Sequence, residues 1–190
     1  MRPFEFIIVF LSFIYTLALT HLLLAAAQMI RHRRELRFSW PHALWMLSAL
    51  LLLAGNWLSL WDFHGLSMMS LPTIAAGFLL VVTQYLICVL VTPALDREAG
   101  YDLRRFHERE SRTYLGAFLA MMFLALALNA AAGSELGVAN WSHQNLLVLA
   151  MLAPIVAALT VRRPWVQVAA PLVMVGLQLA FPILYYPVLQ

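Results

Sequence analysis

The chain has 190 residues, of which 63% are hydrophobic and only 11% are charged, and its mean hydropathy is +0.83. Soluble domains average roughly 45–50% apolar and about 25% charged residues, so this composition excludes a soluble globular protein, a disordered chain and a disulfide scaffold. All 12 basic residues are arginine. Because lysine is absent, a Schiff-base cofactor and a lysine-containing phosphate loop are excluded as well.

Six charge-free stretches, each long enough to cross about 30 Å of hydrocarbon as a helix, divide the chain. We expect helices over about 5–30, 40–61, 71–95, 113–133, 143–161 and 164–188. Serine followed by proline favours the starts of the second and third helices, because serine caps free amides and proline suits a first turn. The predicted fold class is therefore all-α: a polytopic integral membrane protein with a six-helix transmembrane bundle, forming a single transmembrane domain over 1–190.

The arginines indicate the orientation of this bundle. The loops 31–39, 96–112 and 162–163 carry all of them except Arg2, and short loops rich in arginine stay in the cytoplasm. We therefore expect the N and C termini both on the non-cytoplasmic side. A cleaved signal peptide over residues 1–27 is a weaker alternative, because the arginines of 31–37 would directly follow the cut and resist export.

The longest polar loop, 96–112, mixes five arginines with five acidic residues. Leu103, Phe106 and Tyr114 share one side of a helix there, so this segment is expected to lie on the membrane before the fourth span. His107 and Glu108 resemble the start of a zinc-protease HExxH motif, but position 111 is serine, which excludes that class.

Three segments carry a resemblance to a known group: SFIYTLALTHLL at 12–23, RRELRFSWPHALW at 33–45 and YDLRRFH at 101–107. They resemble a family of short polytopic bacterial inner-membrane proteins with about six helices and no assigned activity. The resemblance implies a multi-pass location in the bacterial inner (cytoplasmic) membrane. It implies no catalytic residue.

No ionised residue lies inside a predicted span, but several neutral polar residues fall near one depth and could meet at the midplane. This candidate midplane cluster is Thr20, His21, Gln84, Tyr85 and Gln178. The favoured interpretation is a set of hydrogen bonds that hold the helices together. The alternative is a functional site in which His21 titrates near neutral pH.

Metal sites have only weak candidates in the sequence. Asp62, His64, Glu135 and His143 fall in two neighbouring external loops and offer mixed nitrogen and oxygen ligands. None of them shows a ligand spacing typical of a metal site, and a haem would need a second deep histidine beside His21. We therefore predict no metal and no cofactor.

The sequence contains no catalytic constellation, so we expect a non-enzymatic bundle that acts as an accessory, anchoring or sensory subunit. Its contacts would be anionic lipid headgroups at the cytoplasmic face, a partner membrane protein or a second copy, and no nucleic acid. Candidate contact residues are Arg33, Arg34, Arg104 and Arg105. The alternatives are a small channel or transporter with a neutral site around His21, Gln84 and Gln178, and a metal- or haem-binding redox protein.

Overall fold

A computed structural model describes residues 3–63, 70–93, 102–136 and 141–185. Side chains are described throughout these ranges except at 3, 4, 6, 62, 63, 131–136 and 141–144. The elements are six α-helices and one short 3₁₀ turn: α1 Pro3–Arg31, α2 Trp40–Ser59, η1 Leu60–Phe63, α3 Leu71–Val91, α4 Leu103–Leu136, α5 Trp141–Thr160 and α6 Pro164–Tyr185. The all-helical prediction with six helices is confirmed.

Five of the helices are long and apolar enough to cross a membrane. These stretches are Ile7–Arg31, Trp40–Ser59, Leu71–Val91, Leu103–Ala130 and Pro164–Tyr185. Helix α5 as a whole has 20 residues and rises about 30 Å, and the apolar stretch among its described side chains runs from Asn145 to Thr160. The fold is therefore that of a multi-pass membrane protein, and the sixth crossing stays a prediction.

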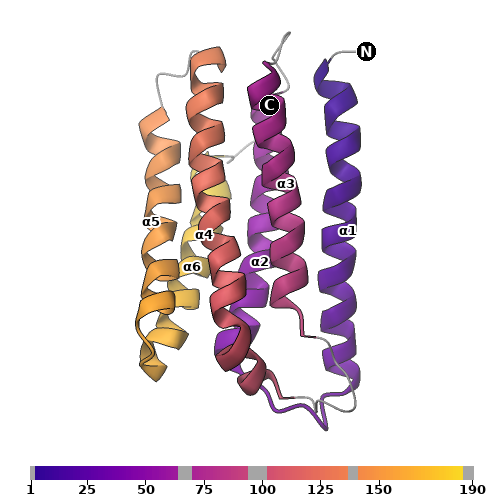
Figure 1. Ribbon diagram of the computed structural model, residues 1–190, viewed down its shortest axis with the longest axis vertical. Coiled ribbons are helices and arrows are strands. Elements are labelled where there is room, and N and C mark those ends of the chain that lie inside the picture. The colour runs from indigo at the N-terminus through magenta and orange to yellow at the C-terminus, as the bar shows by residue number, and fades with distance from the viewer. Residues whose placement is uncertain (1–2, 64–69, 94–101, 137–140, 186–190) are drawn as a thin grey trace.

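The helices form two layers (Figure 1). α1, α3, α4 and α5 stand side by side in one row, and α2 and α6 lie behind it. Each helix runs opposite to the one before it, as short connections require. The packing follows chain order from α3 to α6, where each helix lies against the next, but α1 packs mainly against α3 and α2 mainly against α6. The bundle interior therefore joins both consecutive helices and helices distant in sequence.

The interior is filled by side chains that recur every three or four residues. On α2 the buried face includes His42, Trp45, Ala49 and Leu52, which follow the periodicity of one helix stripe. Trp45 packs against Phe118 of α4, with 5.3 Å between the ring centroids. Large apolar side chains also cover much of the outer surface, which is the pattern expected where lipid rather than water surrounds a bundle.

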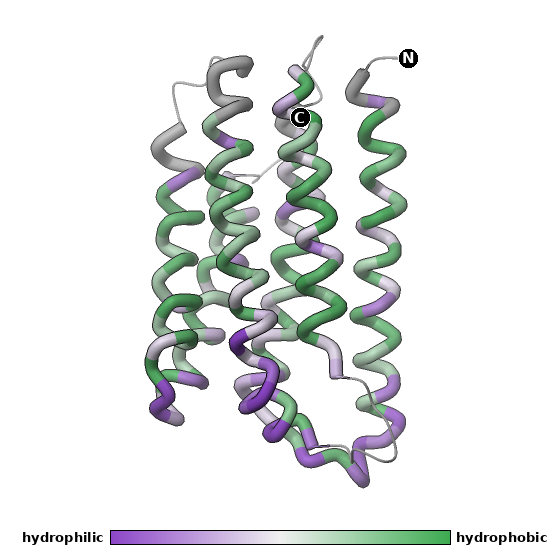
Figure 2. The backbone as a smooth tube through the Cα atoms, in the orientation of Figure 1, coloured by the Kyte–Doolittle hydropathy of each residue, from purple (hydrophilic) through white to green (hydrophobic). Residues whose placement is uncertain are grey.

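Hydrophilic residues gather at one end of the bundle (Figure 2), where the α1–α2 connection, the start of α4 and the α5–α6 turn meet. The backbone N–H of Leu103 donates to the carbonyl oxygen of Arg37 at 3.0 Å. The Arg37 guanidinium lies 3.6 Å from the Asp102 carboxylate. These two contacts join the α1–α2 connection to the start of α4 at this end of the bundle, which is called the arginine-rich end below.

The prediction of a polar connector over 96–112 is wrong from Leu103 onward, because α4 begins there and continues without interruption into the membrane-spanning part. The same segment was expected to lie on the membrane, yet Leu103, His107, Ser111 and Tyr114 are buried in the bundle. Their spacing of three or four residues places them on one side of a helix, while the charged residues face outward. At 34 residues α4 is about 51 Å long, so its polar first turns extend beyond the hydrocarbon thickness.

Helix α3 ends at Val91, earlier than the predicted 95. Thr92 is extended and its backbone N–H still reaches the carbonyl of Val89. The following residue is Pro93, and a residue before proline is disfavoured in helical conformation. The predicted helix end is too late because the prediction followed the apolar stretch and did not take Pro93 as a stop signal.

Asp102 caps the first turn of α4. Its Oδ1 accepts hydrogen bonds from the backbone N–H groups of Arg104 and Arg105, each at 3.0 Å. The bond from Arg105 is the largest cause of a lowered Asp102 pKa; desolvation opposes it, and the Arg104 N–H and the charge of Arg37 add to it. Because the folded pKa is depressed, the cap is in place at neutral pH and is lost only as pH falls through that folded pKa.

We expect Asp102→Ala to loosen this turn. The amide hydrogens of Arg104 and Arg105 should exchange several-fold faster at pH 7, measured by hydrogen–deuterium exchange, because their acceptor is gone. Asp102→Asn is the matched control, since asparagine caps helices about as well as aspartate. Equal exchange rates in the wild type and the alanine variant would show that Asp102 does not hold the turn.

Candidate functional site

A group of buried polar side chains lies just inside the arginine-rich end. This group, called the histidine cluster below, consists of His42 on α2, His107 and Tyr114 on α4, and Gln167 on α6. His107 and Tyr114 are two turns apart on the buried side of α4, and Gln167 lies in the first turn of α6. The cluster therefore joins three helices that are not consecutive in the chain.

The hydrogen bonds of the cluster show which of its atoms donate and which accept. Gln167 Nε2 donates to the carbonyl oxygens of Ala158 and Val161 at 2.9 and 2.8 Å, which satisfies free carbonyls at the end of α5. Its Oε1 therefore faces His107 Nε2, 3.2 Å away. Because an amide oxygen only accepts, Nε2 of His107 carries the hydrogen, and Nδ1 accepts from the Tyr114 hydroxyl.

His42 belongs to the cluster through ring contacts and not through hydrogen bonds. It is 0% exposed, and neither ring nitrogen has a hydrogen-bond partner among the described residues. Its ring meets the edges of Phe106 and Tyr114, with centroids 5.1 and 6.3 Å away. Buried polar groups are normally paired, and the two ring nitrogens of His42 depart from this rule.

The chemistry available to the cluster is polar and neutral. It combines a hydroxyl donor, two imidazoles and an amide, so it can relay a hydrogen-bond rearrangement from α4 to α5 and α6. Among the described residues no group of three or more His, Cys, Asp or Glu side chains comes together in a way that could hold a metal ion. The hydrogen bonds of His107 and Gln167 link α4 to α6 and α6 to the end of α5.

The predicted midplane cluster is not joined by hydrogen bonds. Gln84 is 0% exposed and pairs with α2: its Oε1 accepts from Asn56 at 2.9 Å, and its Nε2 faces the carbonyl of Ala49 at 3.4 Å. Asn56 had not been singled out from the sequence. Gln84 thus holds α2 to α3, as the favoured interpretation expected of a polar residue in a span.

His21 lies elsewhere, with its Nε2 at 2.7 Å from Thr92 Oγ1. Thr92 donates its single hydroxyl hydrogen to the carbonyl of Val89, so it accepts from His21. Thr92 is eight residues from Gln84 in the chain, about 12 Å along a helix. His21 and Gln84 therefore lie about two turns apart and do not share one site.

The other members of the predicted cluster also lie apart. Thr20 is exposed on α1, and Tyr85 packs partly buried against the apolar core. Gln178 is buried on α6, and its amide atoms have no hydrogen-bond partner among the described residues. Instead of one midplane site, the described bundle has several separate polar contacts.

The hydrogen bond between Asn56 and Gln84 gives a direct test of the structural interpretation. We expect Gln84→Leu to lower the free energy of unfolding in detergent by about 0.6 to 1.7 kcal/mol, which are the average and the largest value measured for interhelical hydrogen bonds in membranes. Thr83→Leu is the matched control, because the Thr83 hydroxyl bonds only to the carbonyl of Leu79 within its own helix. A loss no larger for Gln84→Leu than for Thr83→Leu would contradict this role.

The candidate contact residues Arg33, Arg34, Arg104 and Arg105 are all exposed at the arginine-rich end. Arg104 forms an ion pair with Glu108 one turn along α4, at 3.0 Å. The weak metal candidates cannot be placed in the same way: His64 and the side chains of Asp62, Glu135 and His143 lie outside what the structure describes.

Sequence reasoning missed the histidine cluster because it treated the first turns of α4 as a loop. A signal was present: His107, Ser111 and Tyr114 are spaced by four and three residues, and Ser39, His42 and Trp45 by three, which place polar residues on the apolar side of each helix. Comparisons with protein-family models, curated proteins and solved structures found no match for this chain. Its class therefore rests on the fold alone, that of a helical, multi-pass membrane protein.

Proposed function

We propose that the chain is a multi-pass protein of the bacterial inner membrane that works as a non-catalytic accessory, anchoring or sensory subunit, with its arginine-rich end in the cytoplasm. The family resemblance of the segments at 12–23, 33–45 and 101–107 and the distribution of the arginines support this location. The absence of ionised residues from the predicted spans supports a role without chemistry in the membrane.

The observation that carries the proposal is the link between the arginine-rich end and the interior. The exposed Arg104 and Arg105 lie in the same first turns of α4 as His107, and His107 is bonded to Tyr114 and to Gln167 of α6. In this proposal, a partner that binds the exposed side of these turns displaces His107, whose hydrogen bonds join α4 to α6. Contact at the surface and rearrangement of the bundle are thereby coupled.

The proposal is tested by photo-crosslinking in intact membranes. A photoreactive residue at position 105 should give a discrete adduct with a partner protein, and Arg104→Glu should reduce that adduct at least fivefold by reversing the charge of the contact. The control position is Leu79, which is exposed on the apolar part of α3. Identical adducts from positions 79 and 105, or an adduct unaffected by Arg104→Glu, would overturn the proposal.

A small channel or transporter is the second candidate, and polar groups along α2, two of them buried and one half-buried, favour it. His42, Ser48 and Asn56 span 14 residues, about 21 Å of helix, and the Ser48 hydroxyl has no hydrogen-bond partner among the described residues. Flux through reconstituted vesicles that changes with Gln84→Leu or Gln178→Leu would support this candidate over a subunit role. A metal- or haem-binding redox protein is the third candidate, and an absorption spectrum of the pure protein tests it.

A further inference from the structure

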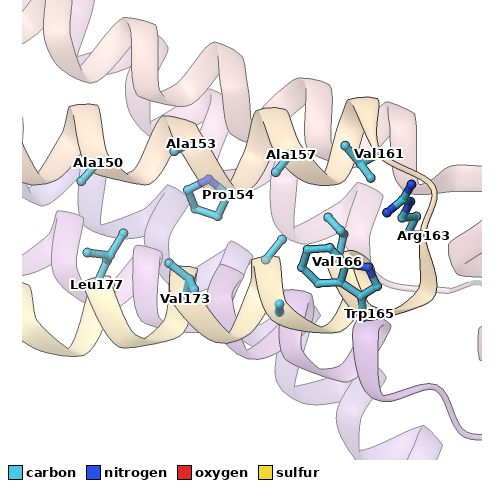
Figure 3. A pocket seen from close by; sticks show the side chains of 12 residues that line it. Ala150, Ala153, Pro154, Ala157, Val161, Arg163, Trp165, Val166, Val173 and Leu177 are labelled. Carbon is cyan, nitrogen blue, oxygen red and sulfur yellow. The ribbon is translucent and has the colours of Figure 1, made fainter.

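An apolar groove runs along the outer surface between α5 and α6 (Figure 3). Its volume is about 840 Å³. The α5 side is lined mainly by small side chains, among them Ala150, Ala153 and Ala157, and the α6 side includes Val173 and Leu177. The small residues of α5 leave a furrow where larger ones would have filled the space between two packed helices.

The groove follows one stripe on each helix. The lining positions 150, 153 or 154, and 157 of α5, continued by Val161 just past its end, and 166, 169 or 170, 173 and 177 of α6 are separated by three or four residues, which is the spacing of a single helix face. From Ala150 to Val161 the helix rises about 17 Å. One leaflet of a bilayer contributes about half of the roughly 30 Å hydrocarbon core, so the length of the groove matches one acyl chain layer.

Positive charge stands at one end of the groove. Arg163, in the turn between α5 and α6, lines it together with Trp165, and both side chains are exposed. Arg162 is adjacent in the same turn and also exposed. An indole at the edge of the apolar region beside a guanidinium is the arrangement found at the headgroup level of a membrane, and a guanidinium binds phosphate oxygens well.

We propose that this groove is a binding site for an anionic phospholipid. The acyl chain lies along the alanine-lined furrow of α5 and α6, and the headgroup phosphate pairs with Arg163. The ligand is a lipid and not a soluble anion, because all lining residues other than Arg163 are apolar over the whole length of the groove. The site adds a lipid contact that is separate from the Arg104 and Arg105 surface.

A second groove has the same design, which supports the assignment. It lies between α1 and α2, measures about 400 Å³, and is lined by apolar residues, among them Leu23, Ala26 and Leu47, with Arg33. Arg33 and Arg163 both belong to the arginine-rich end. Two lateral furrows, each with an arginine among its lining residues at the same end of the bundle, are expected where one leaflet supplies the ligand.

The proposal is tested by fluorescence quenching in nanodiscs that hold one copy of the protein in phosphatidylcholine. The Trp165 signal is the difference between the wild type and Trp165→Phe. At equal mole fractions, phosphatidylglycerol with brominated acyl chains should quench this signal more strongly than brominated phosphatidylcholine. Arg163→Gln should lower the apparent affinity for phosphatidylglycerol about tenfold by removing a charge-assisted contact. Ala157→Phe, which fills the furrow but keeps Arg163, should weaken quenching by both lipids.

The matched control is Arg34→Gln, which removes the same charge from the same end of the bundle but outside both grooves, and it should change the affinity less than twofold. Equal quenching by the two lipids would overturn the proposal, as would an equal loss in Arg34→Gln and Arg163→Gln. Competition by millimolar inorganic phosphate would show a free-anion site instead. If Trp165 were shielded from quenching only in discs that hold two copies, the groove would be an interface between copies and not a lipid site.

Discussion

Replacing Trp45 by alanine is expected to lower the free energy of unfolding by about 2–4 kcal/mol. Aromatic-to-alanine changes in soluble cores cost about 3–5 kcal/mol, from lost transfer out of water and from the cavity left behind. In a membrane the transfer part shrinks, because the unfolded helix is surrounded by lipid, but the cavity part stays. Trp45 is 0% exposed and packs on Phe118, and its indole N–H has no hydrogen-bond partner among the described residues. The expected loss is therefore one of packing.

Trp40 provides the matched control, since it lies in the same helix and is 68% exposed. Trp40→Ala should change the free energy of unfolding by less than about 1 kcal/mol, because no cavity forms. Unfolding in mixed micelles, followed by circular dichroism, compares the two variants. If Trp40→Ala cost as much as Trp45→Ala, the side of α2 that faces the interior would have to be reassigned.

The helix count could be predicted from the sequence because charge is so scarce: a gap between charged residues longer than about 20 positions leaves a helix as the only way to satisfy the backbone in lipid. The same reasoning misplaced the start of α4. It began the fourth span at position 113, directly after Arg112, although charged residues are compatible with a helix wherever one side of that helix faces water. Leu103, His107 and Ser111 are buried, and their spacing of four residues indicates a helix. The pattern can be recognised only when the charged residues between them are assigned to the opposite side of the same helix.

The polar sites were harder to predict than the helices, because the role of a polar residue inside a bundle depends on the group to which it bonds. Gln84 was identified correctly as a buried polar residue, but its partner is Asn56 on α2 and not His21 or Gln178. Depth along each helix was estimated from the sequence, whereas the pairing depends on which helices are neighbours and how each is rotated. Chain order suggests that α1 packs on α2, yet α1 packs mainly on α3, and this exchange brings His21 to Thr92.

The contact between His107 and Tyr114 is expected to be the strongest polar coupling in the described bundle. Removing one partner leaves the other buried and unsatisfied, which costs about 1–3 kcal/mol. His107→Leu and Tyr114→Phe should each destabilise the protein by about that amount. The double variant should be less destabilised than the sum, by about 1–2 kcal/mol, because the second change removes an atom that the first had already left without a partner.

Glu108, the exposed neighbour of His107, provides the control for this double-mutant cycle. Glu108→Gln removes its ion pair with Arg104, and an exposed pair contributes little. Its effect should add to that of Tyr114→Phe within about 0.5 kcal/mol. Additivity of His107→Leu and Tyr114→Phe as well would show that the two side chains are not coupled.

The same variants connect stability to the proposed function. If His107 transmits binding at the arginine-rich end to the interior, Tyr114→Phe should leave the crosslink from position 105 in place, because the exposed side of α4 is unchanged. His107→Leu should abolish the change that partner binding causes in the hydrogen exchange of α6 near Gln167, because it removes the hydrogen bond between His107 and Gln167. Loss of the crosslink itself in Tyr114→Phe would mean that the cluster shapes the binding surface and does not relay its occupancy.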